Sequence, residues 1–301
     1  MLSQSHKPKK SNPEQSNPGQ RHQGLLSGMV MRIEAMWWRH EQAPLLLRWV
    51  SRIYAAINRR NLGKRSAASV YPPLPLISIG NITVGGSGKT PFVIWLCAEL
   101  KARGYRPVVL CRGDGGRLKQ ARRILPNDAA EEVGDEALLL ALRCNAPVIG
   151  GKDRVGGCRL AAELGDVIVL DDGFQYLQLK RNCDIVLIPD VGLGNGQLLP
   201  AGPLREPLDA LQRADLLVRT GSENAEPLSK HREWRWQVKI KDIRPFSGGD
   251  IPDTEDWLAL AGIARADRFF SAAAERVHIS RQMGFPDHHR YTVEDVERIL
   301  K

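Results

Sequence analysis

From Leu74 onward, short apolar runs alternate with longer stretches in which apolar residues recur at helical spacing. Runs of this length, rich in valine, isoleucine and leucine, are typical of buried strands. Strands that alternate with helices predict βαβ units, so we expect an α/β fold with a mainly parallel sheet flanked by helices. The predicted strands are 74–79, 107–110, 147–149, 167–170, 185–188 and 216–218.

The N-terminal part of the chain has a different pattern. Residues 1–24 are rich in Gln, Ser, Pro, Asn, Lys and His, and have too little apolar surface to offset the entropy of ordering, so we predict a disordered tail. Apolar runs follow at 25–31 and 45–57, but Arg48 and Arg52 interrupt the second run. A spanning helix needs roughly 20 consecutive apolar residues. We therefore expect neither run to cross a bilayer.

The second of these runs has the spacing of an amphipathic helix. Its aliphatic residues recur at i, i+4, i+7 and i+11, which places them on one helical face with arginines opposite. Aromatic rings nearby are of the kind that settle at headgroup depth, and the basic side chains could meet anionic lipid. Contact with an anionic membrane surface is favoured, and a helix packed on its own domain is the alternative. The residues are Leu46, Val50, Ile53 and Ile57 on the apolar face, Arg48, Arg52 and Arg59 opposite, and Trp37, Trp38, Trp49 and Tyr54 as the rings.

A cluster of Gly, Ser, Asn and Pro near 220–226 predicts a boundary before a smaller C-terminal α/β domain. There, a polar segment with tryptophans at 233–241 precedes a strand at 257–262, and an amphipathic helix is expected to begin near Val293. The predicted organisation is a tail at 1–24, a membrane-surface helical segment at 25–66, a main α/β domain at 67–222 and the smaller domain at 223–301.

Composition narrows the class of partner without choosing one. The 301 residues carry a formal net charge of +9, which suggests nucleic acid, a phosphorylated substrate or an acidic leaflet. The five cysteines form no C-x-x-C pair, and none lies beside a histidine at metal-ligand spacing. We therefore expect reduced, chemically indifferent thiols and a cytosolic location.

The stretch from Ile77 to Pro91 runs from a strand through glycines into a helical pattern. It matches the phosphate-loop (P-loop) pattern G-x-x-x-x-G-K-[ST], except that Thr83 occupies the place of the first glycine. The remaining glycines let backbone N–H groups point inward toward phosphate oxygens at a helix N-terminus. A glycine-rich turn without a ligand is the alternative. We predict that Lys89 reaches the β- and γ-phosphates, that Thr90 offers its hydroxyl to Mg²⁺, and that the nucleotide is bound by Thr83, Val84, Gly85, Gly86, Ser87, Gly88, Lys89 and Thr90.

Two acids, Asp171 and Asp172, end the apolar run at 167–170. P-loop proteins hold Mg²⁺ with acids at this edge of the sheet. A strand-ending aspartate can also cap a helix, but the phosphate loop in the same chain favours the metal-side role.

The order of these and further motifs resembles one known family. Behind the basic helix come the phosphate loop, G-D-E at 134–136, D-D-G-F-Q at 171–175, L-P-A-G-P-L-R-E at 199–206, A-G-I-x-R-x-x-R-F-F at 261–270 and D-H at 287–288. From about residue 43 to 301 the chain resembles the tetraacyldisaccharide 4'-kinase family. This resemblance implies a P-loop NTPase-like fold and transfer of the γ-phosphate of ATP to the 4'-hydroxyl of a tetraacylated glucosamine disaccharide 1-phosphate in lipid A synthesis. It also implies the cytoplasmic face of the bacterial inner membrane, with peripheral or monotopic attachment.

The resemblance further implies roles for individual residues. Asp135 matches the catalytic base, His288 matches the histidine paired with it, and Lys89 serves the transferred phosphate. Thr90, Asp172 and Glu206 match metal-side positions, and Glu136, Arg154, Asp171 and Gln175 match positions near the cleft.

Two departures from the family pattern bear on activity. Cys111-Arg112-Gly113-Asp114-Gly115 stands where the family usually has Ser-Arg-Gly-Tyr-Gly, so a carboxylate replaces an aromatic residue. The chain also stops at Lys301, before a strand and a Thr-Glu-Lys-Asp motif that the family normally has. We expect the second domain to be incomplete and the last helix to lack a packing partner.

Other functions stay open on the residues alone. A switch-type P-loop ATPase or GTPase, or a metallochaperone, is one, although a GTPase would need an N-K-x-D motif that the chain lacks. A nucleic-acid-binding module is suggested only by charge, and we expect no nucleic acid because many aromatics lie in the N-terminal helix. A membrane-associated, catalytically impaired paralogue is the third. The expected ligands and partners are ATP, Mg²⁺, an acylated disaccharide phosphate lipid and an anionic membrane surface.

Overall fold

The computed structural model describes residues 32–221, 233–239, 243–244, 256–263, 266–287 and 289–301. The predicted tail and the apolar run at 25–31 lie outside the described residues.

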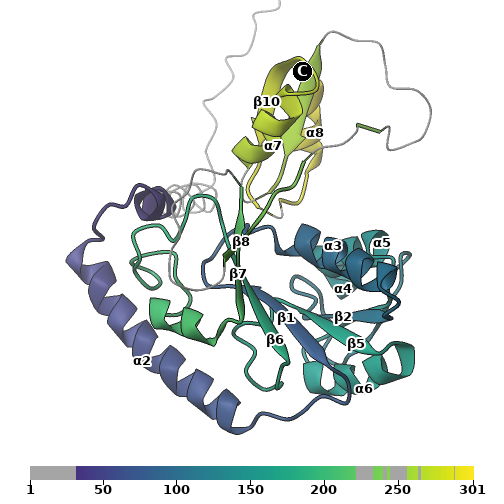
Figure 1. Cartoon of the computed structure of the whole chain (residues 1–301). Coiled ribbons are helices and arrows are strands. Elements are labelled where there is room, and N and C mark those ends of the chain that lie inside the picture. Colours follow the sequence, from purple (N-terminus) through teal and green to yellow (C-terminus); the bar gives the residue numbers. More distant parts are fainter. Residues whose placement is uncertain (1–31, 222–232, 240–242, 245–255, 264–265, 288) are drawn as a thin grey trace, which may run out of the picture.

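Within this described part, eight strands form the central sheet in the order β3-β4-β2-β5-β1-β6-β7-β8 (Figure 1). Neighbouring strands pair in parallel except for β3 and β4. This confirms the predicted α/β fold: apolar runs such as β2 and β5 are buried along their whole length, as strands covered on both faces must be. The strands are β1 Leu76–Asn81, β2 Pro107–Cys111, β3 Arg122–Ile124, β4 Val148–Gly150, β5 Val167–Asp171, β6 Cys183–Ile188, β7 Leu216–Thr220 and β8 Glu233–Trp236.

Strand order places β1 at a switch point of the sheet. The chain leaves β1 toward β2 on one side, and later returns to pair β6 on the other side. Loops at the carboxyl ends of strands diverge at such a point and leave room for a ligand. The glycine-rich loop that follows β1 therefore lies where this topology provides a binding site.

Helices cover both faces of the sheet. Helix α3 (Lys89–Ala102) and helix α5 (Asp135–Arg143), with the short α4 (Ala130–Val133), pack on the face that carries Val109. Helix α6 (Arg154–Leu164) packs on the opposite face against Val108, and the 3-10 helix η1 (Leu208–Arg213) covers β6 and β7 on that same face. Successive residues of one strand thus contact different helices, as the two-residue period of a strand requires.

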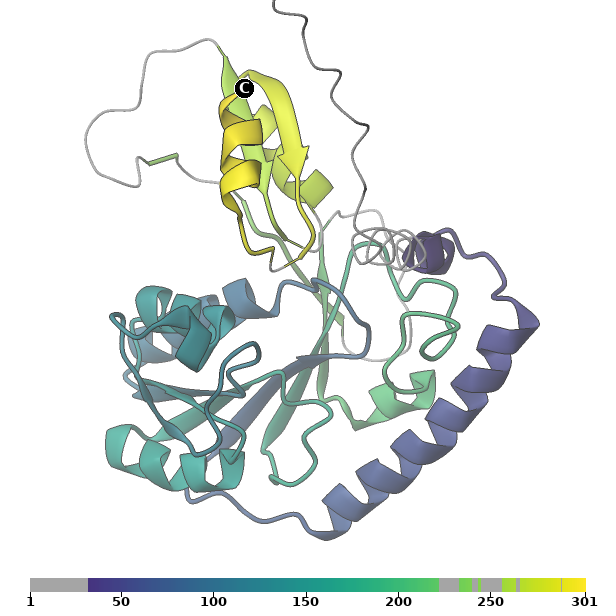
Figure 2. The same ribbon diagram turned by 180° about the vertical axis from the view of Figure 1, so that it is seen from behind.

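Helix α2 (Leu45–Ala67) runs along the outside of the main domain (Figures 1 and 2). The aliphatic residues predicted to share one face do so, and they are exposed: Leu46 by 74% and Ile53 by 58%. Its one buried residue is Ser51. The predicted apolar face is therefore exposed, whereas Tyr54, counted above among the rings at headgroup depth, is half-buried and bonds the main domain. Contact with a membrane surface stays a prediction. Among the described helices, none combines the length and the apolar character that crossing a bilayer requires.

The smaller C-terminal part pairs two parallel strands, β9 (Trp257–Ala261) and β10 (Ile279–Gly284), with helices α7 (Ala266–Ala274) and α8 (Val293–Leu300). The helix predicted near Val293 begins there, and Thr292 caps its N-terminus. Three of its apolar residues, Val293, Val296 and Leu300, are exposed.

Sequence patterns missed β3 and β10, because Arg-Arg-Ile and Ile-Ser-Arg-Gln-Met-Gly lack an apolar run. Strand β8 lies beyond the predicted boundary at 220–226, yet it extends the main sheet by pairing with β7. Its Trp236 packs edge-on against Phe92 of α3, with ring centroids 5.3 Å apart, which explains why this polar strand joins the larger unit. The domain limits themselves stay a prediction.

Gly80 in β1 provides a test of the packing. A Cβ here would lie 2.4 Å from Phe174 Cβ and 2.7 Å from the Phe174 backbone nitrogen. We expect Gly80→Ala to lower the free energy of unfolding by about 1–3 kcal/mol, because the turn that follows β5 would have to move. Urea denaturation measures the loss. Gly63→Ala in α2 is the control, since no atom lies within 4 Å of its added Cβ, and it should hold or slightly raise stability. Equal losses in the two variants would contradict the packing argument.

Candidate active site

The loop between β1 and α3 has the backbone of a phosphate cradle. Gly85 and Gly88 have φ angles of 90° and 79°, a region that other residues rarely adopt. Gly88 is also the N-cap of α3, so Lys89 begins that helix. The first N–H groups of a helix have no intrahelical partner and carry partial positive charge, which makes this end an anion-binding site.

Thr83, at the place of the pattern's first glycine, is accommodated without backbone strain, although its buried hydroxyl has no hydrogen-bond partner among the described residues. It is fully buried and forms an antiparallel bridge with Leu204, while the Val84 N–H donates to the Pro203 carbonyl at 2.9 Å. A bridged residue has an extended backbone, which any L-residue adopts. The missing glycine therefore leaves the loop intact.

Asp172 lies at the centre of the site, directly after β5. Its carboxylate is 3.4 Å from Lys89 Nζ and 3.2 Å from a guanidinium nitrogen of Arg205. Its backbone carbonyl accepts from Arg154 at 3.1 Å. Burial raises the pKa of Asp172, but the positive charges of these three side chains outweigh burial and hold the pKa below its ordinary value. The carboxylate is therefore kept ionised.

Asp171 has the opposite electrostatic environment. Its side chain is buried, and its Oδ1 accepts from the Asp172 N–H at 3.0 Å. Burial raises the pKa of Asp171 to about 6; the negative charges of Asp172 and Glu136 reinforce the shift, while Lys89 and Arg154 oppose it. Two adjacent acids thus differ in acidity, and the influence of Glu136 shows that the start of α5 lies near them.

Asp135 and Glu136 are the first two residues of α5, where the Glu136 N–H donates to Asp135 Oδ1 at 2.9 Å. Gly134, just before them, has a φ of 88°, and a Cβ there would lie 2.3 Å from the Asp114 carbonyl oxygen. The 113–115 loop therefore packs closely against the start of α5. The Asp114 carboxylate, where the family usually has an aromatic residue, is exposed and pairs with Arg112 at 3.2 Å.

His288 lies outside the described residues, so its predicted pairing with Asp135 stays a prediction. The neighbouring His289 bonds Asp295 of α8 at 2.8 Å and has a local structural role. The smaller part reaches the main domain through Arg268 of α7, which lies 3.5 Å from Asp190 in the loop after β6.

Gln175 and Glu206 lie together beneath the phosphate loop. The Gln175 side-chain amide donates to the Asn81 carbonyl at 2.9 Å and to Glu206 at 3.2 Å. The Glu206 carboxylate is 1% exposed and accepts two bonds from Arg213, at 3.0 and 3.1 Å. The predicted metal-side residue Asp172 is thus brought together with Lys89, whereas the cleft residue Gln175 contacts Glu206, whose carboxylate is turned toward Arg213.

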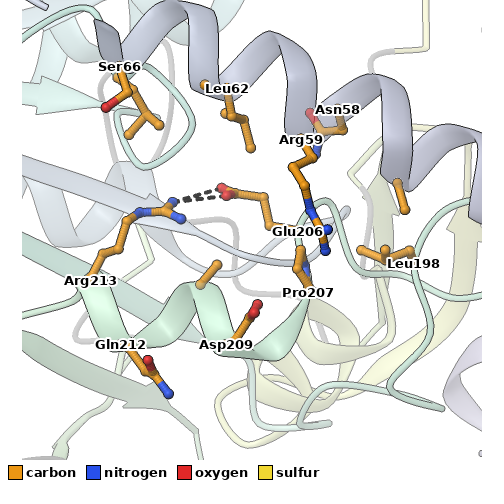
Figure 3. Close-up of a pocket in the computed structure, with 14 residues that line it drawn as sticks. Asn58, Arg59, Leu62, Ser66, Leu198, Glu206, Pro207, Asp209, Gln212 and Arg213 are labelled. Atoms are coloured by element: carbon orange, nitrogen blue, oxygen red, sulfur yellow. Dashed lines mark hydrogen bonds and ion pairs between the residues drawn. The ribbon is translucent and has the colours of Figure 1, made fainter.

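A cavity of about 490 Å³ lies between α2 and η1 (Figure 3). The Glu206–Arg213 pair lies on one side and Asn58 and Arg59 of α2 on the other. Leu62, Leu198 and Pro207 add apolar surface, so the lining is both apolar and charged.

Two arginines that pair with predicted site residues were not themselves predicted as site residues. Arg205 was visible only as a letter of the 199–206 motif, and Arg213 belonged to no motif. Their roles depend on pairing with Asp172 and Glu206, which a single sequence does not display.

No cluster of three or more His, Cys, Asp or Glu side chains in the described ranges has the geometry of a metal site. A nucleotide-bound Mg²⁺ does not need one, because one or two protein oxygens, the phosphates and water complete its shell. The Thr90 hydroxyl at the start of α3 and the ionised Asp172 supply oxygens of the required kind.

The chain is similar in sequence and in structure to known proteins. Residues 43–301 match the family model described as tetraacyldisaccharide-1-P 4'-kinase. The tetraacyldisaccharide 4'-kinase of Methylobacillus flagellatus is 36% identical over 278 residues, covering 88% of this chain and 82% of that protein. The enzyme of the same name from Azorhizobium caulinodans is 38% identical over 287 residues, with coverages of 90% and 82%. The crystal structure of Aquifex aeolicus LpxK in complex with ATP superposes with a TM-score of 0.70 at 31% identity, covering 81% of this chain and 82% of that one.

Gly88→Ala tests the cradle. Its added Cβ would make ordinary contacts, the nearest at 3.7 Å, so the cost comes from the φ of 79°. Left-handed backbone costs an L-residue roughly 1–2 kcal/mol, so we expect ATP affinity to fall about tenfold by calorimetry. Gly104→Ala, at the other end of α3 with a φ of 87° and no atom within 4 Å, carries the same strain and should leave affinity unchanged. A similar loss in both variants would mean that strain acts through global stability.

Proposed function

The chain belongs to the tetraacyldisaccharide-1-P 4'-kinase family and is an ATP-dependent lipid A disaccharide 4'-kinase, and from this premise we propose how its residues carry the reaction. The enzyme transfers the γ-phosphate of ATP to the 4'-hydroxyl of a tetraacylated glucosamine disaccharide 1-phosphate. The observation that carries the residue-level proposal is the glycine loop at the sheet's switch point, with Lys89 and Asp172 paired at the start of α3.

In this proposal the backbone of residues 83–90 holds the phosphates of ATP. Lys89 leaves Asp172 to neutralise charge on the β- and γ-phosphates, which develops as the bond to the leaving oxygen breaks. Thr90 and Asp172 would hold Mg²⁺, which supplies charge neutralisation between the phosphates. Asp172 stays in place because Arg205 and Arg154 still bind it.

Asp135 is the proposed base. As the 4'-hydroxyl oxygen bonds to the γ-phosphorus, the hydroxyl proton passes to the Asp135 carboxylate, and ADP leaves with the electrons of the broken P–O bond. His288 is proposed to orient Asp135. The position of Asp135 at the start of α5, next to Glu136 whose charge helps to raise the pKa of Asp171, supports this assignment.

The remaining predicted residues are proposed to position these groups. Arg154 holds the Asp172 carbonyl, while Asp171 and Glu136 shape the field around it. Gln175 supports the loop through the Asn81 carbonyl. Because the Glu206 carboxylate is taken by Arg213 and Gln175, we favour a positioning role for Glu206 over direct metal contact.

Helix α2 is the proposed membrane contact, at the cytoplasmic face of the bacterial inner membrane. Its outward aliphatic residues and Trp49 are exposed, and Arg52 lies over the Trp49 ring at 5.4 Å. An apolar face flanked by arginines is suited to an anionic leaflet, where each arginine contributes about 1 kcal/mol. An acylated, phosphorylated acceptor would be reached from this surface.

Lys89→Ala tests the transfer step. With γ-labelled ATP, Mg²⁺ and a tetraacyl disaccharide 1-phosphate in detergent, label should enter the lipid with the natural chain and fall at least about 100-fold with the variant. Lys101→Ala near the end of the same helix is the control, because this exposed lysine donates to the Asn145 carbonyl at 2.6 Å, at the opposite end of α3 from the phosphate loop. Near-normal turnover by Lys89→Ala would contradict the assignment of the loop.

Ile53→Ser tests the membrane contact. Ile53 is 58% exposed on α2, and removing its apolar burial in lipid should weaken binding to anionic vesicles roughly tenfold and raise the KM for lipid without changing the KM for ATP. Leu142→Ser is the matched control, since Leu142 is 56% exposed on α5. Unchanged vesicle binding and lipid KM in the α2 variant would contradict the proposed surface.

A further inference from the structure

The inner face of α2 is tied to one short segment of the main domain by polar contacts. Tyr54 Oη donates to the Arg205 carbonyl at 3.0 Å, and Asn58 Nδ2 donates to the same oxygen at 2.8 Å. One turn earlier, Ser51 Oγ donates to the Leu198 carbonyl at 2.9 Å. The helix therefore grips the backbone of residues 198–205, and two of its three bonds meet at a single oxygen.

The opposite side of the same segment is bonded to the phosphate loop. The Arg205 N–H donates to the Ile82 carbonyl at 2.7 Å, and the Val84 N–H donates to the Pro203 carbonyl at 2.9 Å. Thr83 and Leu204 form the bridge between these bonds. A shift of the 203–205 backbone would consequently move residues 82–84, at the start of the phosphate loop.

The Arg205 side chain continues the connection into the site. Its guanidinium lies 3.2 and 3.3 Å from the two carboxylate oxygens of Asp172, and Asp172 lies 3.4 Å from Lys89 Nζ. Asp172 has a φ of 47°, uncommon for a residue other than glycine, so its position depends on the groups that hold it. Hydrogen bonds and ion pairs thus lead without a gap from α2 to the lysine of the phosphate loop.

The seating of α2 depends on these bonds to an unusual degree. Its aliphatic face is exposed and its one buried residue is Ser51, so little apolar burial holds the helix on the domain. In Figure 3, Asn58 lies on the α2 side of the cavity, and Glu206 and Pro207, which follow Arg205 in the chain, lie on the opposite side. Tyr54 and Asn58 are therefore the side chains through which α2 contacts the Arg205 carbonyl directly.

From this geometry we propose that Tyr54 and Asn58 are positioning residues for phosphoryl transfer: by fixing the Arg205 carbonyl they set the Arg205 guanidinium, and with it Asp172 and Lys89. The inference rests on the proposed function. In this proposal α2 both contacts the membrane and aligns the phosphate loop, so binding of α2 to lipid would change the geometry of the active site. Seating of α2 and competence for transfer are then coupled.

Asn58→Ala and Tyr54→Phe in the full chain test the proposal, each of which removes one donor to the Arg205 carbonyl. We expect kcat to fall about tenfold, with the KM values for ATP and lipid within twofold of the natural chain and an unchanged melting temperature. Asn58→Gln, which keeps an amide donor, should recover part of the rate, whereas Asn58→Asp should not. Ser51→Ala is the control for helix seating, since it removes a bond from the same face but leaves the Arg205 carbonyl gripped; its kcat should change less than twofold.

A double-mutant cycle with Arg205→Ala distinguishes positioning from general support. If Asn58 acts through the Arg205 side chain, Asn58→Ala should add less than a twofold loss in the Arg205→Ala background. Full multiplication of the two losses, or an equal loss in Ser51→Ala, would overturn the proposal. A raised lipid KM with normal kcat would also overturn it, and would make Asn58 a lipid-contacting residue of the cavity.

A readout without turnover separates this inference from the kinase assignment. Asn58→Ala should speed amide hydrogen exchange at Val84 and Arg205, whose N–H groups bond the phosphate loop to the 203–205 segment. The exchange of β2 should stay unchanged. If the natural chain transferred no phosphate to lipid, the proposed function would fail while this measurement still tested the mechanical link. Unchanged exchange at Val84 and Arg205 would overturn the link itself.

Discussion

The site depends on the ion pairs that the Asp172 carboxylate makes with basic side chains from other parts of the chain. Lys89 comes from α3, Arg205 from the 199–206 segment and Arg154 from α6, and all three bind this one residue. Unit charges 4 Å apart interact by about 4 kcal/mol at an effective dielectric constant of 20, so the cations would repel one another without a common anion. In the proposed mechanism, incoming phosphates bring negative charge that releases Lys89, while the two arginines keep Asp172 in place. The site is therefore assembled before the nucleotide arrives, and little reorganisation is left for the reaction.

Helix α2 inverts the usual arrangement of an amphipathic helix. A helix on the surface of a soluble protein turns its apolar stripe to the core, whereas here that stripe is exposed and Ser51, Tyr54 and Asn58 bond the domain. Backbone carbonyls in a loop need donors, and Tyr54 and Asn58 provide them at Arg205. The aliphatic residues of α2 are thus left exposed for the proposed membrane contact, while Ser51, Tyr54 and Asn58 attach the helix to residues 198–205 of the domain. In this proposal one helix contacts both the membrane and a segment of the active site.

Sequence patterns predicted those features that depend on neighbours along the chain. Apolar runs predicted six of the eight strands of the main sheet, and the glycines before Lys89 predicted the loop. The acid pair after a strand predicted that Asp172 belongs to the site, where it lies beside that lysine. Features that depend on distant partners escaped. Strand β10 is polar and exists because β9 pairs with it, and Glu206 could not be seen to face Arg213. Periodicity identified the aliphatic and the arginine faces of α2, and both are exposed. It could not show that the side with Ser51, Tyr54 and Asn58 meets the domain, because that is decided by carbonyls almost 150 residues later in the chain.

The phosphate loop shows which letters of a motif are physically required. Gly85 and Gly88 have positive φ angles, so a side chain at either position would be strained. At position 83 the backbone is held extended by the bridge to Leu204, and a threonine fits there fully buried. The first glycine of the pattern is thus replaceable wherever a second segment fixes that end of the loop. In this chain the 203–205 backbone does so and is itself held by α2. The threonine at position 83 and the attachment of the loop to α2 are, on this argument, two aspects of the same structural arrangement.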